Sequence, residues 1–269
     1  RDQFEDPKLV REFISDESSF DKLIEEYETL RKSSDAPFYD FNVTMQNHGG
    51  YAGTHGLIEE EIKVLQPEDP NDQLIQYMNL MKESDQAFEK LLGYFKKVKE
   101  PTLIVMFGDH QPGFTDSVYD ALMGQDTDTL NTADTSRMYI TPYIIWANYD
   151  LQEAAENADL PGSLGMDMSA NYLSSYLLKL IGAPMTGYNK YLLDLMEKVP
   201  VISAICYIGD DGIIHTPEEE SPYSELLLEY QTLQYNHVFD SENHPDDFFF
   251  LKNSDLTEWE FEHTSAPPS

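Results

Sequence analysis

The stretch PTLIVMFGDHQPGF, Pro101–Phe114, decides the fold class. An uninterrupted apolar run from Leu103 to Phe107 predicts a buried strand. The segment before it, residues 71–100, carries apolar residues at helical spacing and leads directly into that strand. A long amphipathic helix followed by a continuously apolar strand is typical of a parallel sheet that helices cover on both faces. We therefore expect an α/β fold with a mostly parallel central sheet flanked by helices.

Further elements are expected on both sides of this stretch. Apolar periodicity predicts helices, whereas β-branched and aromatic runs predict strands. We expect further helices over residues 15–34, 168–184 and 224–240, a short helix near residue 190, and strands over Phe38–Met45 and within residues 137–151. After residue 200 the pattern changes to a strand, a turn at 210–212 and a last helix, and the tail from residue 244 is acidic and aromatic. We predict a division into residues 1–200 and a smaller C-terminal α+β portion, residues 201–269.

Charge is the unusual feature of the composition. The chain has 50 Asp and Glu against 17 Lys and Arg, a formal net charge of −33. Phosphate contacts need Lys and Arg, so we expect no nucleic-acid partner and no docking on anionic lipid through this segment. The single cysteine, Cys206, excludes an internal disulfide and is expected to be a small buried apolar residue.

No apolar run reaches the roughly 20 residues of a membrane helix. The chain opens RDQFEDPKLV, with neither an initiator Met nor a signal peptide, so we expect it to be part of a longer protein.

Two predicted strands end on similar polar sequences, QNHGG at 46–50 and GDHQP at 108–112. In open α/β sheets, ligand sites lie beyond the carboxyl ends of the strands. Asp109 and His110 offer a carboxylate and an imidazole, which suit Mn²⁺, Zn²⁺ or Mg²⁺, and Gly108 permits a turn that lets both converge. Taken alone, the pair is a weak signal, and a polar turn that faces water remains the alternative.

His48 has two interpretations of the same kind. It is either a loop histidine beside glycines that supply backbone freedom, or a donor to a substrate oxygen, with Gly49 and Gly50 leaving room for the substrate. The remaining histidines, His55 among them, lie in polar or tail contexts and are expected to face solvent. The chain has no G-x-S-x-G elbow, phosphate-binding P-loop or dinucleotide-binding glycine motif after a strand. These absences argue against common serine hydrolases, P-loop enzymes and ordinary dinucleotide binders.

Several longer blocks add a resemblance to a known family. They are FNVTMQNHGGY (41–51), AFEKLLGYFKKVKEPTLIVMFGDHQP (87–112), TPYIIWANYDL (141–151) and SANYLSSYLLKLIGAP (169–184). In this order they resemble the sulfatase-like extracellular domain of lipoteichoic acid synthase-type proteins, which belong to the alkaline phosphatase superfamily. The resemblance runs from about Phe4 to Asp240. It implies the alkaline phosphatase-like form of the α/β fold, here truncated at its N-terminal side.

The resemblance also implies a chemistry and a place in the cell. Asp109 and His110 would be metal ligands and His48 would contact the substrate phosphate. The cofactor would be one divalent metal ion, Mn²⁺ in the first place and otherwise Mg²⁺ or Zn²⁺. A threonine nucleophile would attack a lipid-linked glycerophosphate or another phosphate or sulfate ester, forming a covalent intermediate that passes to an acceptor hydroxyl. The domain would lie on the extracellular face of a bacterial membrane, anchored by upstream transmembrane helices.

The chain also departs from the pattern of that family. In the family, the nucleophilic threonine, a metal-binding glutamate and further substrate contacts lie upstream of the block that contains His48, and this chain has no counterpart of them before His48. We therefore expect the chain alone to be inactive and the N-terminal part of the same protein to be its partner. Gly-Gly-Tyr after His48 replaces a bulkier, proline-containing sequence of the synthases, which leaves the substrate open. The alternatives are an inactive surface binding module on the same fold, or a sulfatase or phosphodiesterase of the same superfamily.

Overall fold

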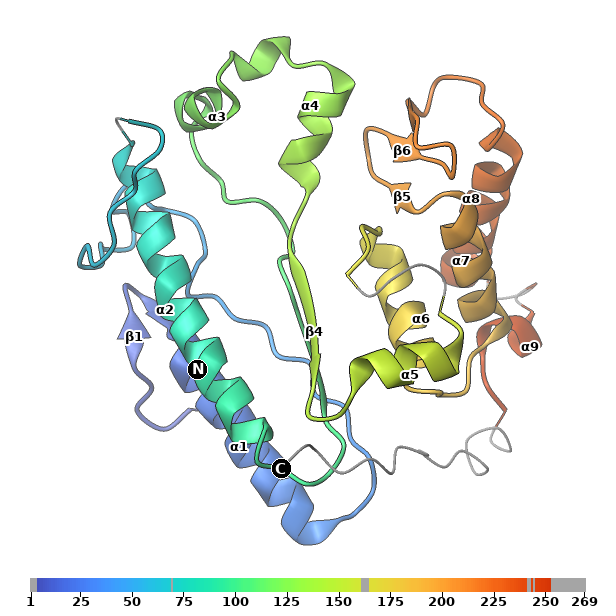
Figure 1. The fold of residues 1–269 in the computed structure, drawn as a ribbon, viewed down its shortest axis with the longest axis horizontal. Helices are drawn as coiled ribbons and strands as arrows, with labels where there is room; N and C mark the ends of the chain where they lie inside the picture. Colours follow the sequence, from blue (N-terminus) through green and yellow to red (C-terminus); the bar gives the residue numbers. More distant parts are fainter. Residues whose placement is uncertain (1–3, 69, 161–164, 241–242, 244, 253–269) are drawn as a thin grey trace. The chain divides into compact units, whose positions relative to one another are not determined.

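The computed structural model describes residues 4–68, 70–160, 165–240, 243 and 245–252 (Figure 1). The chain forms two compact units, each discontinuous in sequence. The first comprises Arg1–Val98 and His110–Leu130, and the second comprises Lys99–Asp109 and Asn131–Ser269. The predicted boundary at residue 200 is a different division and stays a prediction. The acidic tail after residue 252 lies outside the described residues.

Two long helices form the frame of the first unit. Its elements are β1 (Leu9–Val10), β2 (Phe13–Ile14), α1 (Asp16–Ser33), α2 (Asp72–Phe95), α3 (Asp116–Met123) and the 3-10 helix η1 (Thr127–Thr129). Ser15 caps α1 by accepting a hydrogen bond from the Ser18 amide. The two long helices pack through aromatic rings, with the centroids of Tyr27 and Phe95 5.2 Å apart in an edge-on arrangement. The hairpin of β1 and β2 precedes this helix pair in the chain.

The second unit contains the two-stranded sheet of β3 and β4, and its hydrophobic core is formed mainly by helices. Its elements are β3 (Leu103–Phe107), α4 (Thr132–Ser136), the 3-10 helix η2 (Arg137–Tyr139), β4 (Tyr143–Ala147), α5 (Leu151–Ala158), α6 (Ala170–Leu180), α7 (Gly187–Lys198), β5 (Val201–Ile202), β6 (Tyr207–Ile208), β7 (Ile214–His215), α8 (Ser224–Phe239) and α9 (Asp246–Phe249). Strands β5, β6 and β7 form a small antiparallel sheet.

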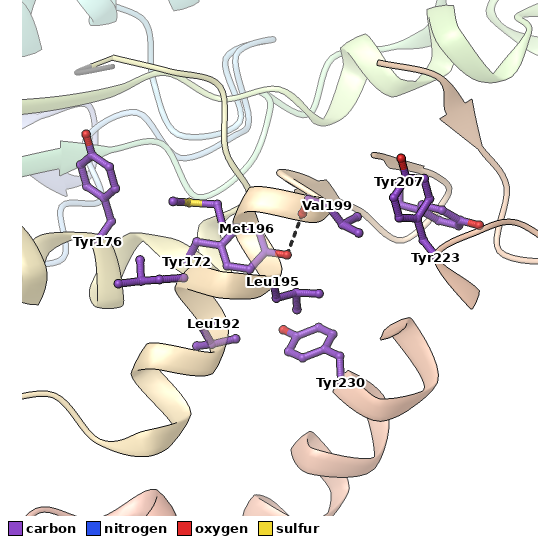
Figure 2. Packing of buried hydrophobic residues seen from close by; sticks show 10 residues of the cluster. Tyr172, Tyr176, Leu192, Leu195, Met196, Val199, Tyr207, Tyr223 and Tyr230 are labelled. Atoms are coloured by element: carbon purple, nitrogen blue, oxygen red, sulfur yellow. Dashed lines mark hydrogen bonds between the residues drawn. The ribbon is translucent and has the colours of Figure 1, made fainter. Parts of the chain in front are cut away.

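The core of the second unit lies where α6 and α7 pack together (Figure 2). The side chains of Tyr172, Leu195 and Met196 are almost completely buried there. A buried phenol needs a hydrogen-bond partner, and the Tyr172 hydroxyl donates to the Val199 carbonyl at 2.8 Å. Burial in this core raises the pKa of Tyr172 above its ordinary value. Cys206, buried as predicted, follows β5.

The α/β class and the long helices are as predicted, but the pairing of the central strands is not. Strand β4 pairs with β3 antiparallel, with Leu103 opposite Ala147 and Phe107 opposite Tyr143. The chain leaves β3 at Phe107 and enters β4 beside that same end, where the Gly108 amide donates to the Pro142 carbonyl at 3.0 Å. A parallel strand would have to start at the other end. Among the described strands, the paired ones are all antiparallel.

The strand predicted over residues 38–45 is also wrong, since the structure has irregular backbone there. Tyr39, Phe41, Val43 and Met45 share one alternation, and their side chains are exposed. A strand is stabilised by ladder hydrogen bonds and by burial of one face, and the described structure supplies neither to this segment.

Two leucines on helices of the second unit give a matched test of this core. Leu195 in α7 is 1% exposed, whereas Leu228 in α8 is 64% exposed. Leu195→Ala should lower the free energy of unfolding by about 2–5 kcal/mol, because it removes buried methyl groups and leaves a cavity. Leu228→Ala should change it by less than about 0.5 kcal/mol. Urea denaturation followed by circular dichroism measures both, and equal effects would contradict the described core.

Candidate functional site

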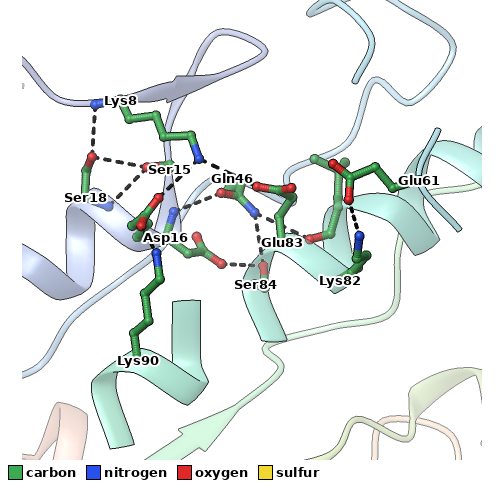
Figure 3. Close-up of polar contacts among 12 residues, drawn as sticks. Lys8, Ser15, Asp16, Ser18, Gln46, Glu61, Lys82, Glu83, Ser84 and Lys90 are labelled. Carbon is green, nitrogen blue, oxygen red and sulfur yellow. Dashed lines mark hydrogen bonds and ion pairs between the residues drawn. The ribbon is translucent and has the colours of Figure 1, made fainter. Parts of the chain in front are cut away.

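The predicted substrate histidine, His48, lies in a turn, residues 46–50, that we call the His48 turn. Gln46 anchors this turn, and its side chain is only 1% exposed. Its Oε1 accepts from the Asp16 amide at 3.0 Å and its Nε2 donates to Ser84 Oγ at 3.2 Å (Figure 3). These bonds use both ends of the buried amide, which avoids the cost of an unsatisfied polar group. The turn is thereby joined to the start of α1 and to the middle of α2.

A buried carboxyl group completes this network. Ser84 Oγ donates to Asp16 Oδ2 at 2.5 Å, and Asn47 Nδ2 donates to Ser84 Oγ at 2.7 Å. Burial raises the pKa of Asp16 above its ordinary value, and hydrogen bonds from Ser84, Thr44 and the Gln46 backbone oppose that rise. Asp16 and Ser84 lie far apart in the sequence, so this network is a tertiary feature.

Arg11 holds the same turn through its main chain. Its Nη2 donates to the carbonyls of Gln46 at 2.8 Å and His48 at 2.7 Å. The guanidinium carbon lies 5.2 Å from the centre of the Phe13 ring and 5.7 Å from that of Tyr51. Burial lowers the pKa of Arg11, an effect that Tyr51 opposes. The His48 backbone is therefore fixed, while the His48 side chain is exposed.

A second imidazole lies beside the same aromatic ring. The Phe13 ring centroid is 5.7 Å from that of His48 and 5.2 Å from that of His55. His55 was expected to face solvent, but its side chain is only 34% exposed and its Nδ1 lies 3.0 Å from Glu12 Oε2. Sequence reasoning missed this contact, because no local pattern links residues 12 and 55.

The two glycines after His48 differ in what they permit. Gly50 has a φ of +90°, and a Cβ added there would lie 2.6 Å from His55 Cδ2. A Cβ on Gly49 would meet nothing within 4 Å. Gly50 therefore provides a left-handed backbone and space for His55, rather than space for a substrate alone.

Asp109 and His110, the predicted metal ligands, follow the end of β3, and both are exposed. Gly108 packs closely here, because a Cβ at this position would lie 3.3 Å from the Cβ of Thr141. His110 Nδ1 lies 2.7 Å from the Gln111 carbonyl, and in the neutral ring this contact favours the tautomer with the proton on Nδ1. In that tautomer Nε2 keeps its lone pair, which is the state that a metal requires.

The donor set at this turn therefore fits part of a metal site. A carboxylate and an imidazole of suitable tautomer are consistent with Mn²⁺ or Zn²⁺. Within the described ranges, no group of three or more His, Cys, Asp and Glu side chains is arranged to hold a metal ion. Metal binding by Asp109 and His110, together with substrate contact by His48, stays a prediction.

Comparison with known proteins gives two findings. A family model described as Sulfatase matches residues 1–183. A protein of Rhizobium meliloti (strain 1021), named as a putative cyclic beta-1,2-glucan modification protein, is 26% identical over 253 residues. That alignment covers 91% of this chain but only 37% of the relative. Helices of the described residues include none that combines the length and the apolar character needed to cross a membrane.

The raised pKa of Asp16 predicts how its contribution to stability depends on pH. Between its ordinary value of 3.8 and the higher folded value, the native chain binds more protons than the unfolded chain. The contribution of Asp16 to stability is thus complete below pH 3.8 and falls as pH rises through the folded pKa. Asp16→Asn removes this dependence, so its stability relative to wild type should improve between about pH 4 and about pH 7.

Urea denaturation at both pH values measures the effect of Asp16→Asn. Asp21→Asn, which changes an exposed carboxylate on the same helix, is the control and should shift less. A relative stability of Asp16→Asn that worsens with rising pH would contradict the described burial.

The two glycines of the His48 turn offer a second test with a built-in control. Gly50→Ala should lower the free energy of unfolding by about 1–3 kcal/mol, because it places a Cβ at a positive φ and against His55. Gly49→Ala should be close to neutral. Thermal unfolding measures stability, and the histidine side-chain NMR signals report on the turn itself. Equal tolerance at both positions would contradict the described turn.

Proposed function

The chain belongs to the sulfatase family, and from that premise we propose that it forms part of a metal-dependent enzyme that transfers or hydrolyses phosphate or sulfate esters. The whole protein's substrate would be an ester of a cell-envelope glycerolipid or glycan. The relative's name, which refers to a cyclic glucan, favours a glycan as the acceptor. Within the family we place the chain with phosphoglycerol transferases of the lipoteichoic acid synthase type, on the residue blocks that resemble them.

The observation that carries this proposal is the construction of the His48 turn. Arg11 and the buried amide of Gln46 fix its backbone, yet the imidazole of His48 remains exposed. A donor held in place before the substrate arrives costs little reorganisation when charge develops on an ester oxygen. His48 would donate a hydrogen bond to a non-bridging oxygen or to the leaving group.

Asp109 and His110 would hold the metal ion. When bound, the ion supplies charge neutralisation at the ester and lowers the pKa of a hydroxyl nucleophile. In this chain, Gly108 lets the strand end pack against Thr141, and the contact between His110 Nδ1 and Gln111 favours the metal-binding tautomer. We assign the nucleophile to no residue of this chain, and propose that it comes from another part of the same protein.

The proposed chemistry suggests a place in the cell. Esters of envelope lipids and glycans are met outside the cytoplasmic membrane, so we propose that the domain faces outward, tethered by parts of the protein beyond this chain. We propose no nucleic-acid partner, in keeping with the net charge of −33.

Calorimetric titration with Mn²⁺ tests the metal site. Wild type should bind one ion per chain, and Asp109→Asn and His110→Gln should each weaken binding at least tenfold, by roughly 1.4 kcal/mol or more. Asp116→Asn removes an exposed carboxylate from the first turn of α3 and should leave binding unchanged. The titration is repeated at high salt, which screens non-specific attraction to the acidic surface.

Equal, weak and salt-sensitive binding by wild type and all variants would mean that the net charge only condenses cations. In that case Asp109 and His110 would be part of a polar turn, and a binding module on this fold would replace the enzyme as the proposed function.

A further inference from the structure

We propose that His55, held by Glu12, is a second imidazole that contacts the tetrahedral oxyanion bound at the His48 turn. The ligand class is a phosphate or sulfate ester, so the inference rests on the proposed function and adds a residue to its site. It is based on the tip of the hairpin formed by β1 and β2, whose residues Arg11, Glu12 and Phe13 all contact this region.

Each of the three hairpin residues contacts a different part of the site. Arg11 binds the main chain of His48, Glu12 binds the ring of His55, and Phe13 lies against both imidazoles. The tight turn at the tip gives Arg11 a φ of +56°, which is strained for a residue with a side chain. Consecutive residues in this strained turn thus fix the backbone at one histidine and the side chain of the other.

The orientation of the His55 ring follows from two contacts. Its Nδ1 is directed to Glu12, and a carboxylate can only accept, so Nδ1 carries a proton. The opposite edge of the ring faces the His48 turn, because the position of a Cβ on Gly50 lies 2.6 Å from Cδ2 and 3.3 Å from Nε2. The Cδ2–Nε2 edge therefore lies beside the backbone two residues after His48. In the doubly protonated ring, Nε2–H is the donor that an oxyanion would meet.

A histidine with a carboxylate neighbour can instead be purely structural, and the chain contains such a comparison. His215 Nε2 lies 3.3 Å from Asp211 Oδ2, and the ring stacks on Tyr207 with centroids 5.2 Å apart. This pair lies in the small sheet of the second unit, far in sequence from any predicted site residue. His215 therefore provides a matched control for His55.

The test is a titration of the full chain with inorganic phosphate, followed by NMR of the histidine side-chain nitrogens, with and without Mg²⁺. Sodium chloride at equal ionic strength is the reference. The His48 and His55 signals should move together, with one dissociation constant, while the His215 signals stay in place. His55→Gln should weaken phosphate binding roughly tenfold, the effect of losing one charged hydrogen bond. Glu12→Gln should weaken it less, and His215→Gln should not change it.

The outcomes separate this inference from the proposed function. If the His48 signals respond and those of His55 do not, His55 is structural and the oxyanion site of the proposed function remains. If neither histidine responds, the oxyanion site itself is wrong and both proposals fail. If His215 responds as strongly as His55, the signals report bulk salt and the inference is overturned. The wild-type titration decides among these cases even where a variant is poorly folded.

Discussion

Burial of the Gln46 amide is the constraint on which the first unit's candidate site depends. An unsatisfied buried polar group costs about 1–3 kcal/mol, so this amide must find partners for both of its ends. Its oxygen accepts a hydrogen bond from the Asp16 amide. That amide belongs to the first turn of α1, whose N–H groups have no acceptor within the helix. Its nitrogen donates a hydrogen bond to the hydroxyl oxygen of Ser84 on α2. One side chain thus joins a helix start, a helix middle and the His48 turn.

From this constraint follows the contrast between a rigid backbone and an accessible side chain at His48. The side chains of Gln46 and Asn47 bind Ser84, and Arg11 binds the main chain of the turn, so the backbone at His48 is held while its ring stays exposed beside Phe13. Loops positioned by a rigid scaffold are the usual place for functional residues. The positive φ of Arg11 also indicates a rigid turn, because a strained backbone persists only where the surrounding contacts hold it in place.

What the sequence could predict was decided by the range of each interaction. Helical periodicity and capping residues are local, and α1, α2, α6 and α8 lie where those patterns predict them. The apolar run at Leu103–Phe107 likewise predicts β3. Whether β3 pairs parallel or antiparallel depends on where the chain returns after Gly108. The apolar pattern of a strand carries no information about that return. The segment over residues 38–45 has strand composition, but composition supplies no ladder partner. The contacts of Arg11, Glu12 and Asp16 join residues 30 or more positions apart, and no local pattern indicates them.

A net charge of −33 repels any anionic ligand that approaches the chain. At about 0.1 M salt, charges beyond roughly 10 Å are largely screened, so an anion at the surface responds mainly to its immediate neighbours. The charged groups next to the His48 turn include the Arg11 guanidinium, which contacts carbonyl oxygens and aromatic rings, and the Glu12 carboxylate, which contacts His55. Arg11 donates its hydrogen bonds to the main chain of the turn that presents His48, whereas Glu12 lies on the His55 side. An acidic chain can in this way keep one positive charge next to the His48 backbone, held there by two main-chain carbonyls.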